Sequence, residues 1–468
     1  MVFSSILFLC IFLPVVIGVS FLLPVRLRNF WLLLGSLVFY AWGEPRYILL
    51  MAATALLDYL AGLLLGRAEK PSARRAVLVT ALVLNLGSLC FFKYTDFLIG
   101  NLNSLFGGSL QLLGLALPVG ISFYTFQTLS YVIDVYRRQV AVQKNFLDFF
   151  LYVSLFPQLI AGPIVRYSDV EHELHRRSVS VDGFAHGAIR FCVGLGKKVL
   201  LANPAGALYE SARALTIGGE GSVLGGWLLA IAFTFQIYFD FSGYSDMAIG
   251  MGEMLGFRFP ENFRYPYEAE SVTDFWRRWH ITLSTWFREY LYIPLGGNRK
   301  GKGRQIFNLL VVWALTGIWH GAGWNFLLWG LYFFLLLTLE KLFLLRVLEK
   351  LPGFFRHLLA LLAIVFGWVL FSSESLREVG KIAASMVGVG TPLFTDGALY
   401  LLRGGIALLL LCAVGSTHFP AKLPALLEEK GQAKTVFICR AVGALALLIL
   451  SVCFLAGDSY NPFLYFRF

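Results

Sequence analysis

Charged side chains are scarce in this chain, and their scarcity already limits the class of protein. Only 14% of the 468 residues are Asp, Glu, Lys or Arg, whereas 58% are hydrophobic and 16% are aromatic. Soluble domains carry about 25% charged residues. Because apolar runs also recur from one end of the chain to the other, we predict an all-α, polytopic membrane protein in contact with membrane lipid.

Other features are missing as well. The six cysteines form no Cys-x-x-Cys pair and lie in or beside apolar runs, which argues against a disulfide framework or a cysteine zinc site. No metal site is predicted, because His172 and His175 lie in a stretch that reads as an exposed charged loop. No fixed-period repeat, Pro-rich linker or long polar stretch divides the chain. We therefore expect one membrane domain over residues 1–468, with no bound cofactor.

The apolar runs predict about 10 to 12 transmembrane or re-entrant helices, since a span takes roughly 17 to 25 residues and shorter runs can break or re-enter. The run 2–24 has no basic residue before it and no obvious cleavage site, so we interpret it as a retained first span. The net charge of +11 is concentrated in short basic clusters, the densest at residues 299–304. Such clusters mark the cytoplasmic side and leave the N-terminus outside, and this gives no support to nucleic-acid binding.

Two histidines stand inside this aromatic sequence. His280 occurs in Phe-Trp-Arg-Arg-Trp-His-Ile-Thr-Leu-Ser and His320 in Leu-Thr-Gly-Ile-Trp-His-Gly-Ala-Gly-Trp-Asn. Titratable groups are costly in a membrane, and histidine is the side chain best suited to exchange a proton near neutral pH. The pair therefore predicts acid/base chemistry. The alternative for His280 is an interfacial histidine on an aromatic face, and the alternative for His320 is an interhelical hydrogen bond or an interfacial position.

The segment 275–295 is too charged to cross lipid as an exposed helix, so we expect it at the interface or inside protein. As one helix it would carry Trp276, His280, Leu283, Phe287 and Tyr290 on a single aromatic face. Pro294 and the glycine-rich basic run 295–304 then predict a flexible loop that could hold the phosphates of an anionic donor. The alternative for this loop is a topology signal alone.

His320 is expected deep in the membrane. A straight helix from Arg304 would place it about 24 Å from the basic loop, within a hydrocarbon core of about 30 Å. Glycines at 317, 321 and 323 allow close approach, and Trp319 and Trp324 offer flat walls. These neighbours predict a lined cavity around the imidazole.

With both Trp-His pairs in view, the chain resembles the membrane-bound O-acyltransferases, in particular the bacterial branch that contains the membrane subunit of alginate O-acetylation. The resemblance covers nearly the whole length. Besides the two histidine motifs, the matching stretches are residues 39–47 (Phe-Tyr-Ala-Trp-Gly-Glu-Pro-Arg-Tyr), 122–138, 156–164 (Phe-Pro-Gln-Leu-Ile-Ala-Gly-Pro-Ile), 238–248 (Tyr-Phe-Asp-Phe-Ser-Gly-Tyr-Ser-Asp-Met-Ala), 261–267 (Glu-Asn-Phe-Arg-Tyr-Pro-Tyr) and the ending 460–468.

The resemblance implies a many-helix enzyme of the bacterial inner membrane with a tunnel. Through it, an acetyl group from a cytoplasmic thioester donor, acetyl-CoA, would reach an extracytoplasmic acetyltransferase partner that esterifies a polysaccharide. The family's principal catalytic histidine falls on His320 and its second histidine on His280.

We hypothesise that His320 is the general base on the acceptor hydroxyl and that His280 orients or polarises the donor. Predicted donor-binding residues stand in or beside the two motifs: Arg277, Arg288, Trp276, Trp319 and Asn325. Three acids would hold a histidine in one tautomer or, equally well, stabilise contacts between helices: Asp134, Asp240 and Asp246. Direct transfer is expected because the chain lacks a Gly-x-Ser-x-Gly elbow, although Thr282 and Ser284 leave an acyl-enzyme open.

Besides a protein or lipid acyltransferase of the wider family, two other functions stay open at this point. One is D-alanyl transfer to teichoic acid by a related enzyme with the same two histidines. The other is a membrane transporter, since polar residues inside a helical bundle also mark substrate paths. No pair of related halves, which many transporters show, is apparent in the sequence.

Overall fold

The computed structural model describes residues 1–160, 162–457 and 463–464, and these residues form helices and no strand. The predicted all-α class is confirmed. The chain divides into two compact units, one made of Met1–Phe191 and Ser245–Pro260, the other of Cys192–Tyr244 and Glu261–Phe468. The prediction of a single membrane domain stays a prediction.

Among the described residues, six helices are long and apolar enough to cross a membrane: α3, α4, α11, α17, α19 and α21. The expected 10 to 12 segments included runs that are shorter or interrupted in the structure. The first apolar run forms only Phe8–Leu22. A later apolar stretch is interrupted too, because the helix that begins at Phe146 ends at Ser154, just before Phe156 and Pro157.

The first unit holds the N-terminal helices. Their bounds are η1 Phe8–Phe12, α1 Leu13–Leu22, α2 Val25–Gly43, α3 Ile48–Arg67, α4 Pro71–Phe106, α5 Ile121–Arg137, α6 Phe146–Ser154, α7 Phe156–Leu159, α8 Tyr167–His175 and the start of α9, Val181–Gly196. The segment of His172 and His175, predicted to be a loop, is the helix α8, and both histidines are exposed.

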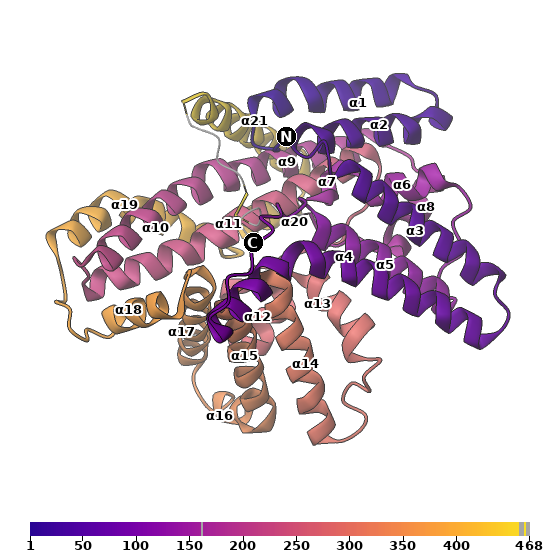
Figure 1. The fold of residues 1–468 in the computed structure, drawn as a ribbon. Coiled ribbons are helices and arrows are strands. Elements are labelled where there is room, and N and C mark those ends of the chain that lie inside the picture. The colour runs from indigo at the N-terminus through magenta and orange to yellow at the C-terminus, as the bar shows by residue number, and fades with distance from the viewer. Residues whose placement is uncertain (161, 458–462, 465–468) are drawn as a thin grey trace. The chain divides into compact units, whose positions relative to one another are not determined.

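Helix α5 is the core of this unit, since it is buried on nearly every side. It begins after Gly120, whose φ of 78° favours glycine. It packs against α3 and α4, which lie beside it in Figure 1. At Gly62 of α3, an added Cβ would lie 2.5 Å from the Tyr131 hydroxyl, so only glycine lets the two helices approach this closely.

The second unit carries both histidines. Its elements are η2 Lys197–Ala202, α10 Asn203–Gly218, most of α11 Val223–Leu255, η3 Pro266–Glu268, α12 Val272–Arg278, α13 Ile281–Phe287, η4 Arg288–Tyr292, α14 Lys302–His320, α15 Trp324–Leu339, η5 Glu340–Leu344, α16 Leu345–Leu348, α17 Gly353–Ser372, α18 Leu376–Met386, α19 Asp396–Gly415, α20 Phe419–Glu429 and α21 Ala433–Gly457.

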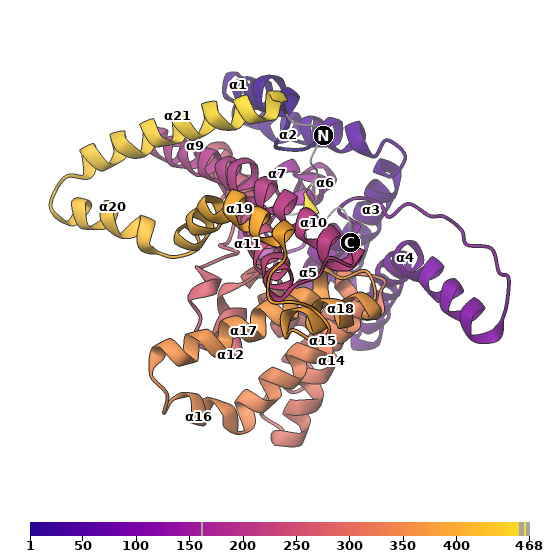
Figure 2. The same ribbon diagram turned by 90° about the vertical axis from the view of Figure 1, so that its left-hand side faces the viewer.

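Helices α14 and α15 form the tightest pair in this unit and lie side by side in Figure 1. At Gly317 an added Cβ would lie 2.4 Å from the Phe326 carbonyl oxygen, and at Gly330 it would lie 2.3 Å from that of Trp313. Two glycines therefore let the backbones touch. Helix α17 packs on α15. Helices α20 and α21 form a helical hairpin (Figure 2).

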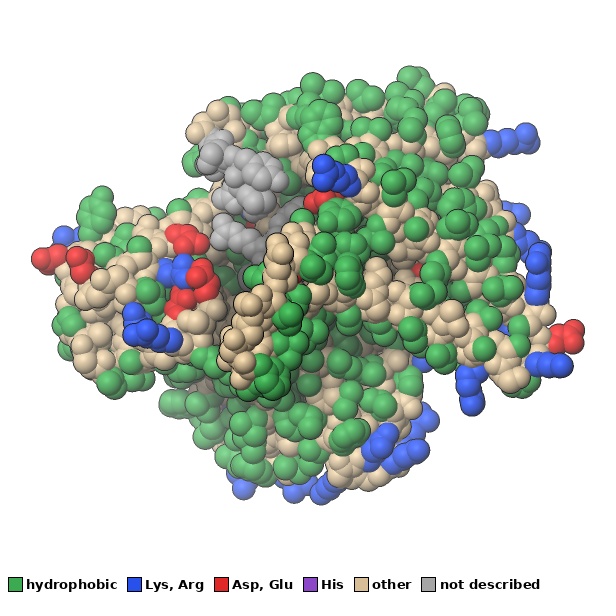
Figure 3. Space-filling view, viewed as in Figure 1, with side chains coloured by type: hydrophobic (Ala, Val, Ile, Leu, Met, Phe, Trp, Pro, Cys, Tyr) green, Lys and Arg blue, Asp and Glu red, His purple; other side chains and the backbone are tan. Residues whose placement is uncertain are grey.

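The predicted helix from the basic loop to His320 is confirmed as α14. Its 19 residues span about 28 Å. The residues 298–301 that precede it and its first three residues are exposed. Hydrophobic side chains cover the flanks of this part of the unit, while Lys and Arg side chains gather at its lower tips (Figure 3).

Candidate active site

His280 does not lie within a helix. The single helix expected over residues 275–295 is wrong, because α12 ends at Arg278 and α13 starts at Ile281. His280 between them adopts the left-handed conformation, with φ 44° and ψ 54°. A non-glycine residue there costs about 1–3 kcal/mol and persists only where the surroundings impose it.

Asn262 imposes this conformation from a segment 18 residues earlier. Its Oδ1 lies 3.1 Å from His280 Nδ1 and accepts hydrogen bonds from the Thr282 hydroxyl (2.9 Å) and backbone N–H (3.4 Å). Its backbone oxygen accepts from Ile281 N at 3.0 Å. Asn262 thus caps α13 and fixes the imidazole with one side chain.

These contacts also define the protonation state of His280. The Thr282 backbone N–H can only donate, so the Asn262 atom at this point is an oxygen, and Nδ1 of His280 must carry the hydrogen. Burial lowers the pKa of His280 to about 3, which keeps the ring neutral at physiological pH. Among the described residues Nε2 has no hydrogen-bond partner. It therefore presents a lone pair.

A cavity of about 270 Å³ opens at this imidazole. Its walls come from α12, α13 and η4 on one side and from α14, α15 and η5 on the other, and they are mainly apolar, with Leu283, Phe287, Leu309 and Val312 among them. Three basic side chains also line it, and all are exposed: Arg277, Arg288 and Lys341. Because His280 is only 1% exposed, the cavity connects a basic rim with a buried ring.

The start of α12 is held by a buried carboxylate. Glu340, 3% exposed, accepts hydrogen bonds from Val272 N (2.7 Å), Thr273 N (2.8 Å) and Thr273 Oγ1 (2.6 Å). A negative charge at a helix N-terminus is stabilising. Glu340 therefore fixes the helix that leads into His280 and carries Trp276.

His320 is the last residue of α14 and is 5% exposed. Aromatic rings enclose it edge-on, with centroids 4.9 Å away at Trp329 and 5.3 Å away at Phe371. The lining of the cavity reaches Thr316, four residues or about 6 Å along α14 from His320. The Trp319 ring lies beside both imidazoles, with its centroid 6.3 Å from that of His280 and 4.9 Å from that of His320.

Comparison with known proteins decides the family. The model of the membrane-bound O-acyltransferase family matches residues 137–377, about half of the chain and both histidines. The chain is 39% identical to the probable alginate O-acetylase of Azotobacter vinelandii, over 100% of each protein. The chain belongs to the membrane-bound O-acyltransferase family. The transporter interpretation is therefore set aside in favour of a multi-pass O-acyltransferase.

Two further relatives of this acyltransferase are named for different activities. The peptidoglycan O-acetyltransferase of Helicobacter pylori is 35% identical, over 83% of this chain and 80% of the relative. The teichoic acid D-alanyltransferase of Bacillus subtilis is 26% identical, over 48% of this chain and 59% of the relative.

The structure brings together some of the predicted donor-binding residues of the acyltransferase. Arg277, Arg288 and Trp276 line the cavity, and Trp319 lies against both histidines. Asn325 is not in the cavity lining, and its amide donates to the Ser373 carbonyl at 3.0 Å. Their roles in binding remain predictions.

Two of the three predicted supporting acids form ion pairs with basic side chains. Asp240 pairs with Lys198 Nζ at 2.6 Å and accepts from Leu464 N at 2.7 Å. Asp246 pairs with Arg190 at 2.9 Å in the first unit, where Asp134 is buried on α5. For Asp240 and Asp246 these ion pairs agree with the alternative interpretation, in which the acids stabilise contacts between helices.

Sequence reasoning missed three side chains: Asn262, Glu340 and Lys341. Only Asn262 had a signal, since it lies in the stretch Glu-Asn-Phe-Arg-Tyr-Pro-Tyr that carried the family resemblance. The ending 460–468, which carried it too, lies outside the described residues except for Phe463 and Leu464.

Proposed function

We propose that this acyltransferase transfers an acetyl group from a thioester donor of the acetyl-CoA class toward a polysaccharide hydroxyl on the opposite side of the membrane. The observation that carries the proposal is the cavity that joins an exposed basic rim to the buried imidazole of His280, next to His320. The similarity to the Azotobacter alginate O-acetylase and the Helicobacter peptidoglycan O-acetyltransferase supports acetyl as the group and a polysaccharide as the acceptor.

The cavity suits one part of such a donor. Its volume of about 270 Å³ is below the roughly 300–1,000 Å³ of sites that enclose drug-sized ligands. A thin, flexible thioester arm fits between the apolar walls, whereas a nucleotide would stay outside. At the rim, Arg277, Arg288 and Lys341 supply positive charge to its phosphates.

The two histidines then divide the chemistry. His320 takes the proton of the acceptor hydroxyl while the hydroxyl oxygen attacks the carbonyl carbon of the thioester. The C–S bond breaks, and the proton passes to the leaving thiolate. His280, neutral with a lone pair on Nε2, accepts a hydrogen bond from an amide N–H of the donor arm. It orients the donor rather than polarising its carbonyl, because polarisation would need a hydrogen on Nε2.

The sidedness follows from charge. The exposed basic residues between positions 299 and 304 lie at the start of α14, and basic segments of this kind mark the cytoplasmic side, so we place the donor rim there and the N-terminus outside. In a bacterial inner membrane the acetyl group would then pass to an extracytoplasmic partner acetyltransferase that esterifies the polysaccharide. The acyl donor is a substrate, and no resident cofactor takes part.

The test is acetyl turnover by the purified protein in lipid nanodiscs with labelled acetyl-CoA. His320→Ala should abolish transfer and donor hydrolysis, whereas His172→Ala, an exposed histidine on α8, should leave both at the wild-type rate. Unchanged turnover in His320→Ala would remove the proposed base.

A parallel reaction with a D-alanyl thioester distinguishes the second function. The D-alanyltransferase relative matches less than half of this chain, so we expect acetyl to be preferred. A preference for D-alanyl would contradict the assignment of the acyl group and leave the role of His320 intact.

A further inference from the structure

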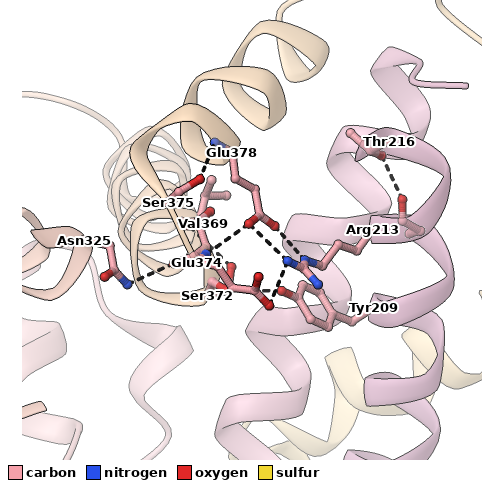
Figure 4. A network of polar contacts seen from close by, with 11 residues as sticks. Tyr209, Arg213, Thr216, Asn325, Val369, Ser372, Glu374, Ser375 and Glu378 are labelled. Carbon is pink, nitrogen blue, oxygen red and sulfur yellow. Dashed lines mark hydrogen bonds and ion pairs between the residues drawn. The ribbon is translucent and has the colours of Figure 1, made fainter. Parts of the chain in front are cut away.

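Arg213 and Glu378 form a two-point ion pair between α10 and α18. The guanidinium donates from Nε at 2.6 Å and from Nη2 at 3.1 Å to the two carboxylate oxygens (Figure 4). The Glu378 side chain is 8% exposed and that of Arg213 is 24% exposed. Bidentate pairs of this kind fix geometry as well as adding stability.

The same carboxylate holds the turn between α17 and α18. Glu378 Oε2 accepts from the backbone N–H of Glu374 at 3.0 Å. Two other side chains donate hydrogen bonds to the backbone carbonyls just before Glu374. The Tyr209 hydroxyl donates to the Ser372 carbonyl at 3.4 Å, and the Asn325 amide donates to the Ser373 carbonyl at 3.0 Å (Figure 4). Consecutive backbone groups of the turn are thus bound by side chains from α10, α15 and α18.

The residue that precedes this turn packs against the proposed base. Phe371, the residue before Ser372, packs its ring at 5.3 Å from His320 and at 5.2 Å from Phe326. Asn325, which binds the turn, is the second residue of α15, after the short link that follows His320. A shift of the turn would therefore move the Phe371 ring that contacts the imidazole and, through Asn325, the start of α15.

We propose that Arg213 and Glu378 are positioning residues for His320, acting through the turn at 372–375 and the ring of Phe371. The proposal rests on the proposed function, in which His320 is the base. Neither residue lines the donor cavity. Loss of the pair should therefore lower kcat and leave donor binding intact.

The network contains its own control. Glu374 also pairs with Arg213, at 3.1 Å, but its side chain is 79% exposed. An exposed ion pair contributes little, and the side chain of Glu374 is not the group that holds the turn. Glu374→Ala should therefore behave as wild type, although it removes a carboxylate from the same arginine.

The experiment compares Arg213→Ala, Glu378→Ala, their double variant and Glu374→Ala in the acetyl-turnover assay, with rates expressed per folded molecule. Because small misplacement near reacting groups can lower rates about 100-fold, we expect kcat to fall by about 10- to 100-fold in both single variants, with donor KM within about 2-fold of wild type. The double variant should be no slower than either single variant, since each already breaks the pair.

Glu378→Gln serves if the alanine variant does not fold. It keeps an oxygen for the Glu374 amide and should recover part of kcat, which a loss of fold alone would not predict. Wild-type kcat in Glu378→Ala, or an effect confined to KM, would overturn the proposal. If His320→Ala is active while Glu378→Ala is slow, the proposed function fails instead.

Discussion

Replacing Glu340 by glutamine tests how the fold maintains the break at His280. Helix α12 has seven residues, too few to be stable alone, and the buried Glu340 carboxylate binds two of its first backbone N–H groups and the Thr273 hydroxyl. Hydrogen bonds to a charged acceptor contribute about 1.5–3 kcal/mol each. Glutamine keeps one oxygen and turns an NH2 group toward a donor, so the expected loss is about 3 kcal/mol.

Thermal unfolding in nanodiscs, followed by tryptophan fluorescence, measures this loss. We expect Tm to fall by on the order of 5 °C. The rate of acetyl turnover should fall as well, because α12 carries Trp276 and leads into His280. Glu349→Gln, at an exposed position after α16, should change neither quantity. Wild-type Tm and turnover in Glu340→Gln would refute the reasoning.

Three other outcomes are expected. Gly330→Ala should lower the free energy of unfolding by about 1–3 kcal/mol, because its Cβ would lie 2.3 Å from the backbone of α14. Gly303→Ala should not lower it, because no atom lies within 4 Å of the added Cβ. Chemical denaturation of the two variants measures both free energies. Asn262→Leu should lower both turnover and Tm, with partial recovery in Asn262→Asp, which keeps the acceptor oxygen. The pKa of His280, lowered by burial to about 3 from 6.5, means that its contribution to stability is complete above about pH 6.5 and declines below it, by up to about 1.4 kcal/mol per pH unit. A shallower fall of Tm with acid in His280→Gln would confirm this, and identical slopes would contradict it.

Local composition predicts the membrane class of the fold and the course of α14. The apolar runs gave the all-α membrane class, and the basic loop followed by an apolar stretch gave α14 as a continuous helix ending at His320. The glycines of the second Trp-His motif were read as points of close approach, and Gly317 is such a point. These features depend on neighbouring residues, which is why the sequence reveals them.

The break at His280 could not be predicted in this way. Its residues fit the spacing of a continuous helix, and no proline or glycine interrupts positions 275–287. The break is imposed by Asn262, 18 positions earlier, and the start of α12 is fixed by Glu340, 68 positions after Val272. Side chains this distant in sequence act only through tertiary structure. The helical periodicity therefore predicted a helical backbone at His280, where the structure has a left-handed residue between two helices.

The two Trp-His pairs are alike in sequence and are held by different physical means. His320 closes a regular helix, and its place depends on glycines that bring α14 against α15. His280 occupies a left-handed backbone that costs about 1–3 kcal/mol, a cost that Asn262 offsets by capping α13. A helical His280 could be maintained without that cost. The strained conformation therefore indicates that the direction of the ring matters, because it leaves Nε2 without a partner among the described residues, at the wall of the cavity and beside the tryptophan that contacts His320.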